Sequence, residues 1–154
     1  MDTVRQATLR DIDTIVELRM KLLHELGIIK KIEGSDTLRT ATRGYFIKKI
    51  QTGEFAVWIA ESGSDTVSMT CIHFIENPPE SENITGIEAF VMDIYTEREW
   101  RGRGIASTLL EKVIQYARDR NTKKLILDTI GTDRRIYEKR GFKATTSEME
   151  LLLK

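Results

Sequence analysis

The sequence is poor in cysteine, proline and histidine: its 154 residues include one cysteine, two prolines and two histidines. A single cysteine cannot form a disulfide within the chain, and with two separated histidines it offers no ligand set of zinc-site spacing. No run approaches the roughly 18 apolar residues of a membrane-spanning helix, and residues 1–10 contain no signal-peptide core. These absences predict a cytoplasmic protein that has no metal centre and does not cross a membrane.

An excess of charge of either sign is also missing. Lysine plus arginine and aspartate plus glutamate both number 24, so the formal net charge is zero. Nonspecific binding to nucleic acids or to membrane surfaces depends on an excess of positive charge, so we expect neither partner. Any site for a phosphate group must therefore come from a local cluster of donors.

The composition that is present is typical of a folded domain. Hydrophobic residues make up 40% and charged residues 31% of the chain, which separates it from disordered proteins. Domains most often hold about 100 to 150 residues. We therefore expect residues 1–154 to form a single domain with one core.

The first part of the chain predicts one strand and two helices. Residues 3–8 alternate weakly between polar and apolar side chains and predict a strand. Apolar residues then recur at three- and four-residue steps over 12–26 and again over 36–50, which is typical of amphipathic helices. Asp11 is the expected N-cap of the first helix.

A change in the spacing of apolar residues predicts β-strands in the middle of the chain. Residues 54–62 and 66–75 are rich in valine, isoleucine, phenylalanine and tryptophan, and the glycine, serine and aspartate between them favour an antiparallel hairpin. A loop with both prolines follows, and then a strand that begins at Ile84 or Ile87 and ends at Tyr95.

The last part returns to alternating helices and strands. Residues 104–121 carry the most regular amphipathic pattern, 124–129 predict a short buried strand, 133–140 a short helix and 142–154 closing strands. A strand, helix and strand in succession imply a parallel, right-handed crossover, whereas the hairpin is antiparallel. We expect an α/β fold with a mixed, mostly antiparallel central sheet of about 6–7 strands and about four flanking helices.

The turn that follows the strand ending at Tyr95 is the most informative segment. Gly102 and Gly104 let the backbone approach a ligand because they carry no Cβ, and the free amides of the following helix face the same ligand. The helix start supplies about half a positive charge, to which Arg101 and Arg103 add full charges. The segment therefore predicts a small anion-binding cradle.

Two common phosphate-binding motifs do not fit this turn. A Walker loop needs Gly-Lys-Ser or Gly-Lys-Thr after four spacers, and the sequence contains none. A Rossmann fingerprint needs a third glycine where this chain has Ser107.

A third pattern does fit. Residues 101–106, Arg-Gly-Arg-Gly-Ile-Ala, match an arginine or glutamine, two spacers, a glycine, one spacer and a glycine or alanine. After a further helix and strand, residues 136–142 are similar to a Tyr-Glu-Lys-x-Gly-Phe signature. With the strand at 94–96, these motifs resemble the Gcn5-related N-acetyltransferase (GNAT) superfamily, and the order of elements matches over nearly the whole chain. The resemblance implies acetyl-CoA as co-substrate and a splayed pair of central strands.

The same resemblance assigns the coenzyme site. The amides of residues 102–107 would hold the coenzyme A pyrophosphate, and the side chain of Arg101 would pack the loop. The backbone at Ile94 and Thr96 would pair with the pantetheine arm, and Asp133 stands where family members often have an asparagine that touches it. The expected cofactor-binding residues are Ile94, Tyr95, Thr96, Arg101, Gly102, Arg103, Gly104, Ile105, Ala106, Ser107, Asp133, Tyr137 and Lys139.

The resemblance also suggests the chemistry. Tyr137 lies where the family usually places the phenol that protonates the departing thiolate, and a phenol pKa near 10 suits a leaving thiolate with a pKa of about 8.5. A strand amide near Ile94 or Tyr95 would stabilise the oxyanion. Lys139 would reach the ribose phosphate or would simply be solvated.

Two carboxylates on the strand that enters the site are candidate bases. Alternation places Glu88 on the face of Phe90 and Met92, and Asp93 on the opposite face, so only one of them points toward substrate unless a bulge intervenes. We favour Glu88. Many enzymes of this kind deprotonate the amine through water, so the activity does not require a dedicated base.

The function predicted from these residues is acetyl transfer from acetyl-CoA to a primary amine of a small molecule or protein. The alternatives are a non-catalytic acyl-CoA sensor and, disfavoured by the zero net charge, an RNA-binding module. The alternating residues 147–153 could also pair across a homodimer.

Overall fold

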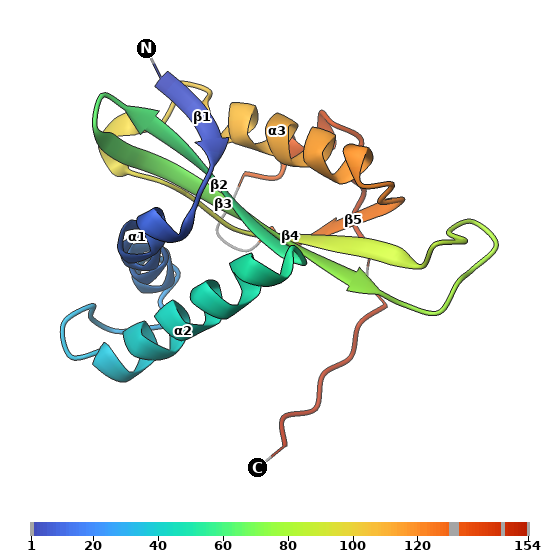
Figure 1. Ribbon diagram of the computed structural model, residues 1–154, viewed down its shortest axis with the longest axis horizontal. Coiled ribbons are helices and arrows are strands. Elements are labelled where there is room, and N and C mark those ends of the chain that lie inside the picture. The colour runs from blue at the N-terminus through green and yellow to red at the C-terminus, as the bar shows by residue number, and fades with distance from the viewer. Residues whose placement is uncertain (1, 130–132, 146, 154) are drawn as a thin grey trace.

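A mixed β-sheet forms the centre of the protein in the computed structural model, which describes residues 2–129, 133–145 and 147–153 (Figure 1). Within these residues the sheet has five strands in the order β1-β2-β3-β4-β5. Their bounds are β1 Asp2–Gln6, β2 Phe55–Ser62, β3 Asp65–Glu76, β4 Ile87–Thr96 and β5 Lys124–Leu127. The first four strands pair antiparallel, and β5 runs parallel to β4. The mixed, mostly antiparallel sheet is therefore confirmed.

Helices cover both faces of this sheet (Figure 1). They are α1 Ile12–Glu25, α2 Asp36–Thr52, α3 Ile105–Asp119 and α4 Arg135–Glu138, with short 3-10 turns η1 Leu9–Asp11 and η2 Arg98–Trp100. Alternate strand residues divide between two layers. Val57 and Cys71 pack toward α1 and α2, whereas Ala56 and Ile72 pack toward α3 and α4. Among the helices that the structure describes, none has both the length and the apolar composition to cross a bilayer.

The start of α1 confirms the predicted position of the N-cap but not the capping role of its side chain. Asp11 occupies the N-cap position, but its side chain makes no capping hydrogen bond to α1. Its carboxylate instead accepts hydrogen bonds from the Thr8 amide at 2.7 Å and from both terminal nitrogens of Arg5 at 2.9 Å. These hydrogen bonds, above all those from Arg5, lower the pKa of Asp11. The side chain of Asp11 therefore links Arg5 of β1 to η1 and does not cap α1.

A β-bulge interrupts β4. In the pairing with β3, Asp93 and Ile94 together oppose the single residue Thr70, and Asp93 has a φ of +55°. Such a bulge turns two successive side chains out of strict alternation. Asp93 consequently forms an ion pair with Arg19 of α1, on the layer where Met92 also packs. The bulge is the exception that the sequence analysis allowed for, and because of it Met92 and Asp93 lie on the same face rather than on opposite faces.

The pairing of β4 with β5 is short. It begins at Glu88 opposite Lys124 and ends at Val91 opposite Leu127. β4 continues to Thr96, and within the described residues no strand pairs with this continuation on the β5 side. The end of β4 that leads into the glycine-containing turn thus has an open edge.

The predicted closing strands are the largest departure from the sequence analysis. Residues 142–145 and 147–153 contain no strand, so the described sheet has five strands rather than about 6–7. The apolar alternation is present, but a strand forms only where a neighbour satisfies its backbone groups.

Candidate active site

A cavity of about 600 Å³ opens beside the turn between β4 and α3. We call it the loop cavity. It is bounded by the end of α1, the end of β4, the turn, the first residues of α3, and residues beside α4. Its walls are formed by Leu22, Glu25, Leu26, Ile94, Tyr95, Thr96, Trp100, Arg101, Gly102, Gly104, Ile105, Ala106, Ser107, Asp133 and Ile136. The structure thus brings most of the predicted cofactor-binding residues to one cavity.

The turn is shaped by two glycines in the left-handed region. Gly102 has a φ of +77° and Gly104 a φ of +78°, a conformation that strains any residue with a Cβ. Gly104 caps α3 and its carbonyl accepts the amide of Thr108 at 3.0 Å. The amides of the first helical turn have no partner inside a helix. Those of Ile105 and Ser107 belong to residues of the cavity wall, so the positive end of α3 faces this space.

Arg101 connects the turn to β4 and α1 through hydrogen bonds. Its Nε donates to the carbonyl of Thr96 at 2.8 Å, and its two terminal nitrogens donate to Glu25 of α1, each at 2.8 Å. The hydrogen bonds from Arg101 are the main cause of a lowered pKa of Glu25. Much of the positive charge that the sequence assigned to the cradle is therefore balanced by Glu25, which the sequence analysis did not place in the coenzyme site.

Two other predicted cofactor-binding residues lie outside the wall of the loop cavity. The guanidinium of Arg103 stacks over the ring of Trp100, 4.5 Å from its centroid, and donates to the carbonyl of Glu99 at 3.0 Å. Lys139 follows α4 and is exposed. Arg103 belongs to the turn and Lys139 directly follows α4, but neither residue forms part of the wall of the loop cavity.

Tyr137 lies in the core and is not part of the wall of the loop cavity. Only 1% of its surface is exposed, and its ring packs edge-on against Phe142 with the centroids 6.1 Å apart. It belongs to the core cluster that includes Val113 of α3, while its neighbour Ile136 lines the cavity. This packing fixes the position of the Tyr137 ring within the core.

The two candidate bases are held by different cations. Glu88 lies at the start of β4 and its carboxylate is 3.5 Å from the Nζ of Lys124. Asp93 lies next to the cavity residue Ile94, and its carboxylate is 2.8 Å from the Nε of Arg19. Burial of the phenol is the main cause that raises the pKa of Tyr45, and Cys71 and Asp93 contribute to the same direction. Neither carboxylate lines the loop cavity itself.

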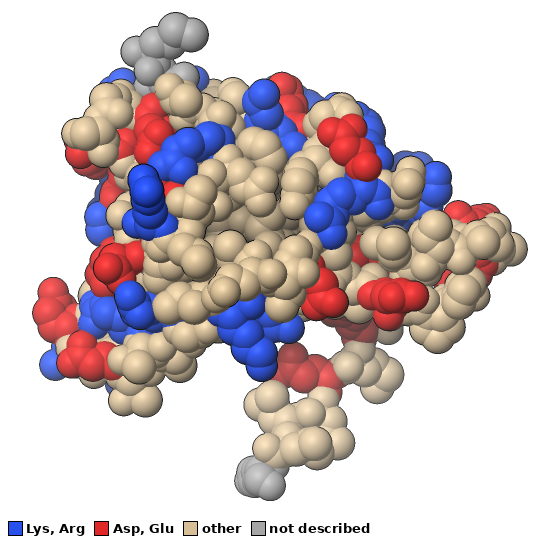
Figure 2. All heavy atoms as spheres, in the orientation of Figure 1, with Lys and Arg blue, Asp and Glu red and all other residues tan. Residues whose placement is uncertain are grey.

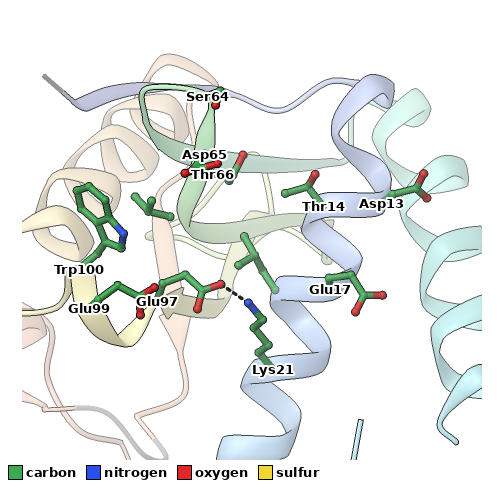
Figure 3. A pocket seen from close by; sticks show the side chains of 12 residues that line it. Asp13, Thr14, Glu17, Lys21, Ser64, Asp65, Thr66, Glu97, Glu99 and Trp100 are labelled. Atoms are coloured by element: carbon green, nitrogen blue, oxygen red, sulfur yellow. Dashed lines mark hydrogen bonds and ion pairs between the residues drawn. The ribbon is translucent and has the colours of Figure 1, made fainter. Parts of the chain in front are cut away.

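A second cavity, of about 610 Å³, lies nearby and has a different lining (Figure 3). We call it the acidic cavity. Its walls carry the carboxylates of Asp13, Glu17, Asp65, Glu97 and Glu99. Lys21 forms an ion pair with Glu97 inside it. Over residues 2–129, 133–145 and 147–153, no group of three or more histidine, cysteine, aspartate or glutamate residues is arranged to hold a metal ion.

Comparisons with curated proteins agree with this geometry. Human N-acetyltransferase 8 is 33% identical over 92 residues, which are 57% of this chain and 38% of that protein. Mouse N-acetyltransferase 8B is 30% identical over 91 residues, with the same two coverages. The chain thus spans less than half the length of these relatives.

Solved structures match over nearly the whole chain. A crystal structure from Clostridium acetobutylicum, described as a "predicted acetyltransferase with acetyl-CoA", is 32% identical, covers 99% of this chain and 96% of its own, and has a TM-score of 0.89. Glucosamine-6-phosphate N-acetyltransferase from Arabidopsis thaliana is 16% identical with a TM-score of 0.77, which shows a shared fold. The model of the acetyltransferase (GNAT) family matches residues 24–142. The chain therefore belongs to the acetyltransferase (GNAT) family.

Proposed function

We propose that the protein transfers the acetyl group of acetyl-CoA to a primary amine. The observation that carries this proposal is the meeting of two features in the loop cavity: the free amides at the start of α3 and the open edge of β4. The first suits an anionic pyrophosphate. The second suits an extended arm with amide groups, which can pair with a strand edge as a further strand would.

The residues present fit the coenzyme in both respects. The amides of residues 102–107 would bind the pyrophosphate, and the backbone of β4 from Ile94 to Thr96 would pair with the pantetheine arm. Arg101 would hold the turn in place through Glu25 and Thr96 rather than act as a counter-ion. The acetyl-CoA-bound relative from Clostridium acetobutylicum supports this choice of co-substrate.

The proposed reaction is direct attack of the amine on the thioester. The amine nitrogen forms a bond to the carbonyl carbon, the carbon–sulfur bond breaks, and the thiolate takes a proton from the phenol of Tyr137. A backbone amide near Ile94 or Tyr95 would stabilise the oxyanion during this step. The rigid packing of Tyr137 against Phe142 would keep the phenol aligned.

The amine must lose a proton, and we propose that Glu88 receives it through water, because Glu88 precedes Ile94 by six residues of β4, about 20 Å along the strand. Glu88 stands on β4 and is partly buried beside Lys124. Asp93 is closer to the loop cavity along the strand, but its carboxylate accepts a hydrogen bond from Arg19 at 2.8 Å, a tighter pairing than the 3.5 Å between Glu88 and Lys124. We therefore assign Asp93 a positioning role at the bulge. The acceptor would approach from the side of α1 and α2, where Arg19 and Tyr45 lie.

The experiment has two stages. Calorimetric titration with coenzyme A tests binding, and free-thiol release from acetyl-CoA in the presence of a panel of amines tests turnover. We expect saturable binding and thiol release with at least one class of amine. Absence of binding at millimolar coenzyme would contradict the proposal. Binding without thiol release from any amine would favour a non-catalytic acyl-CoA sensor instead.

A further inference from the structure

Charge is dispersed over the surface of the protein. Figure 2 shows one face of the molecule, on which basic and acidic side chains are interspersed. The formal net charge of the chain is zero as well. Long-range attraction therefore selects poorly among acceptors, and a preference for one kind of amine must come from individual groups beside the reacting atoms.

The sheet opens next to the bulge in β4. β5 pairs with β4 only as far as Val91, and the bulge at Asp93 follows two residues later. The carboxylate of Asp93 lies on the α1 side of the sheet, where it accepts a hydrogen bond from the Nε of Arg19 at 2.8 Å. The next residue, Ile94, lines the loop cavity, and the proposed oxyanion contact is an amide near it. Asp93 therefore holds Arg19 beside the proposed reaction centre, on the side from which the acceptor approaches.

Arg19 has hydrogen-bond donors that the described part of the protein does not use. Its Nε is paired with Asp93, but neither Nη1 nor Nη2 donates a hydrogen bond to any residue that the structure describes. The side chain is 28% exposed, and neither atom is among the fully buried polar atoms without a partner, so both reach solvent. A planar guanidinium with two free nitrogens can bind a carboxylate through two parallel hydrogen bonds.

Other arginines in similar surroundings are engaged differently. Within the described residues, the other partly buried arginines are Arg5, Arg39 and Arg140. Each of these three uses at least one terminal nitrogen in a hydrogen bond to another group of the protein. Arg19 is therefore the partly buried arginine of the described chain whose terminal nitrogens are left for a ligand.

Tyr45 of α2 supplies a further donor on the same side of the sheet. Its side chain is 40% exposed, and its ring packs edge-on against Phe55 with the centroids 5.4 Å apart. Burial is the main cause that raises the pKa of its phenol; Cys71 and Asp93 contribute in the same direction, whereas the charge of Arg19 opposes it. The phenol therefore keeps its proton at neutral pH and can donate a hydrogen bond.

We propose that the acceptor is a small amine that also carries a carboxylate, as an amino acid does, and that Nη1 and Nη2 of Arg19 bind this carboxylate. The inference rests on the proposed acetyl transfer and narrows its acceptor. Asp93 balances part of the charge of Arg19, so the pair suits a group with one negative charge better than a phosphate with nearly two. A carboxylate held by Arg19 directs an amine a few bonds away toward the thioester beside Ile94.

Matched pairs of amines test the role of the carboxylate. Free-thiol release from acetyl-CoA is measured with the common amino acids, with their carboxamides, and with phosphoethanolamine as an amine that carries a phosphate. We expect kcat/KM for at least one amino acid to exceed that for its carboxamide by about 10- to 100-fold, which is the usual contribution of hydrogen bonds to a charged group. Equal values for every pair, or the highest value for phosphoethanolamine, would overturn the proposal.

Substitution of Arg19 tests the residue itself. Arg19→Met should reduce the ratio of the two kcat/KM values to near one. Arg19→Lys keeps a cation beside Asp93 but loses the two parallel donors, so it should lower the ratio in part, and it serves if the methionine variant does not fold. The matched control is Arg39→Met, because the Arg39 side chain is also 28% exposed and also forms an ion pair. A ratio that is unchanged in both Arg19 variants, or that falls equally in the control, would overturn the proposal.

The failure of this inference differs from the failure of the proposed function. Thiol release only with amines that lack a carboxylate would leave acetyl transfer in place and contradict the role of Arg19. Saturable coenzyme binding without thiol release from any amine would overturn both proposals.

Discussion

The two cavities have nearly the same volume, about 600 Å³ and about 610 Å³, and both have Trp100 in their walls. Their linings differ. The loop cavity presents the first amides of α3 and only two carboxylates, Glu25 and Asp133, each hydrogen-bonded to an arginine. The acidic cavity presents five carboxylates and one lysine. A polyanionic coenzyme is attracted to the first and repelled by the second, so the sign of the charge, rather than size, distinguishes the candidate site.

The largest expected effect concerns Tyr137, the proposed general acid. Tyr137→Phe removes the proposed acid and keeps the packed ring. We expect kcat to fall by about 100-fold, the usual contribution of a general acid, with coenzyme affinity nearly unchanged. Steady-state kinetics and calorimetry measure the two quantities. An unchanged kcat would remove Tyr137 from the mechanism and leave it as a core aromatic residue.

A second substitution adds negative charge to the loop cavity and so makes its electrostatics resemble those of the acidic cavity. Ser107→Asp adds a carboxylate within the first turn of α3, where it stabilises the helix but repels phosphate. One added like charge costs on the order of 1–3 kcal/mol at close range, so the coenzyme Kd should rise on the order of 5- to 100-fold. Thr14→Asp, in the wall of the acidic cavity, is the matched control and should leave the Kd unchanged.

A third prediction tests whether the hydrogen bonds between Arg101 and Glu25 stabilise the fold by holding the turn against α1. The pKa of Glu25 lies below its usual value of 4.5 because Arg101 donates hydrogen bonds to it. A lowered folded pKa means that the pair stabilises the fold above pH 4.5 and loses this contribution as the pH falls through the folded pKa. Glu25→Gln should therefore melt at a lower temperature than the unmodified protein at pH 7, and the gap should close in acid. A gap that stays constant or widens as the pH falls below 4.5 would contradict this role.

The smallest effect is expected in the acidic cavity. Glu99→Gln removes one of its carboxylates without touching the wall of the loop cavity. Exposed charges at this range are largely screened by salt, so the coenzyme Kd should fall by less than about threefold at physiological ionic strength. A fall in the Kd of tenfold or more would mean that the coenzyme binds in the acidic cavity.

The turn could be predicted from sequence because its signals are local. Gly102 and Gly104 adopt positive φ angles that few other residues tolerate, and the regular apolar pattern after them sets where α3 begins. The residues around these glycines therefore meet in one cavity. Strand pairing up to Tyr95 was predictable for the same reason, because β-formers and turn residues mark the hairpin.

The remaining features depend on partners far away in the sequence. The bulge at Asp93 leaves no mark in the local pattern, since it arises from the register with β3. The pairing of Arg101 with Glu25 joins residues that only the fold brings together. Segment 147–153 has the alternation of a strand, but alternation alone does not supply the neighbouring strand that it needs.

Amide chemical shifts measured by NMR during titration with coenzyme A test the central assignment most directly. We expect the largest changes on the amides of residues 102–107, at the turn and the first residues of α3, while those of Asp13 and Asp65 in the acidic cavity stay nearly constant. Saturable changes centred on the acidic cavity, or no changes at the turn with millimolar coenzyme, would contradict it.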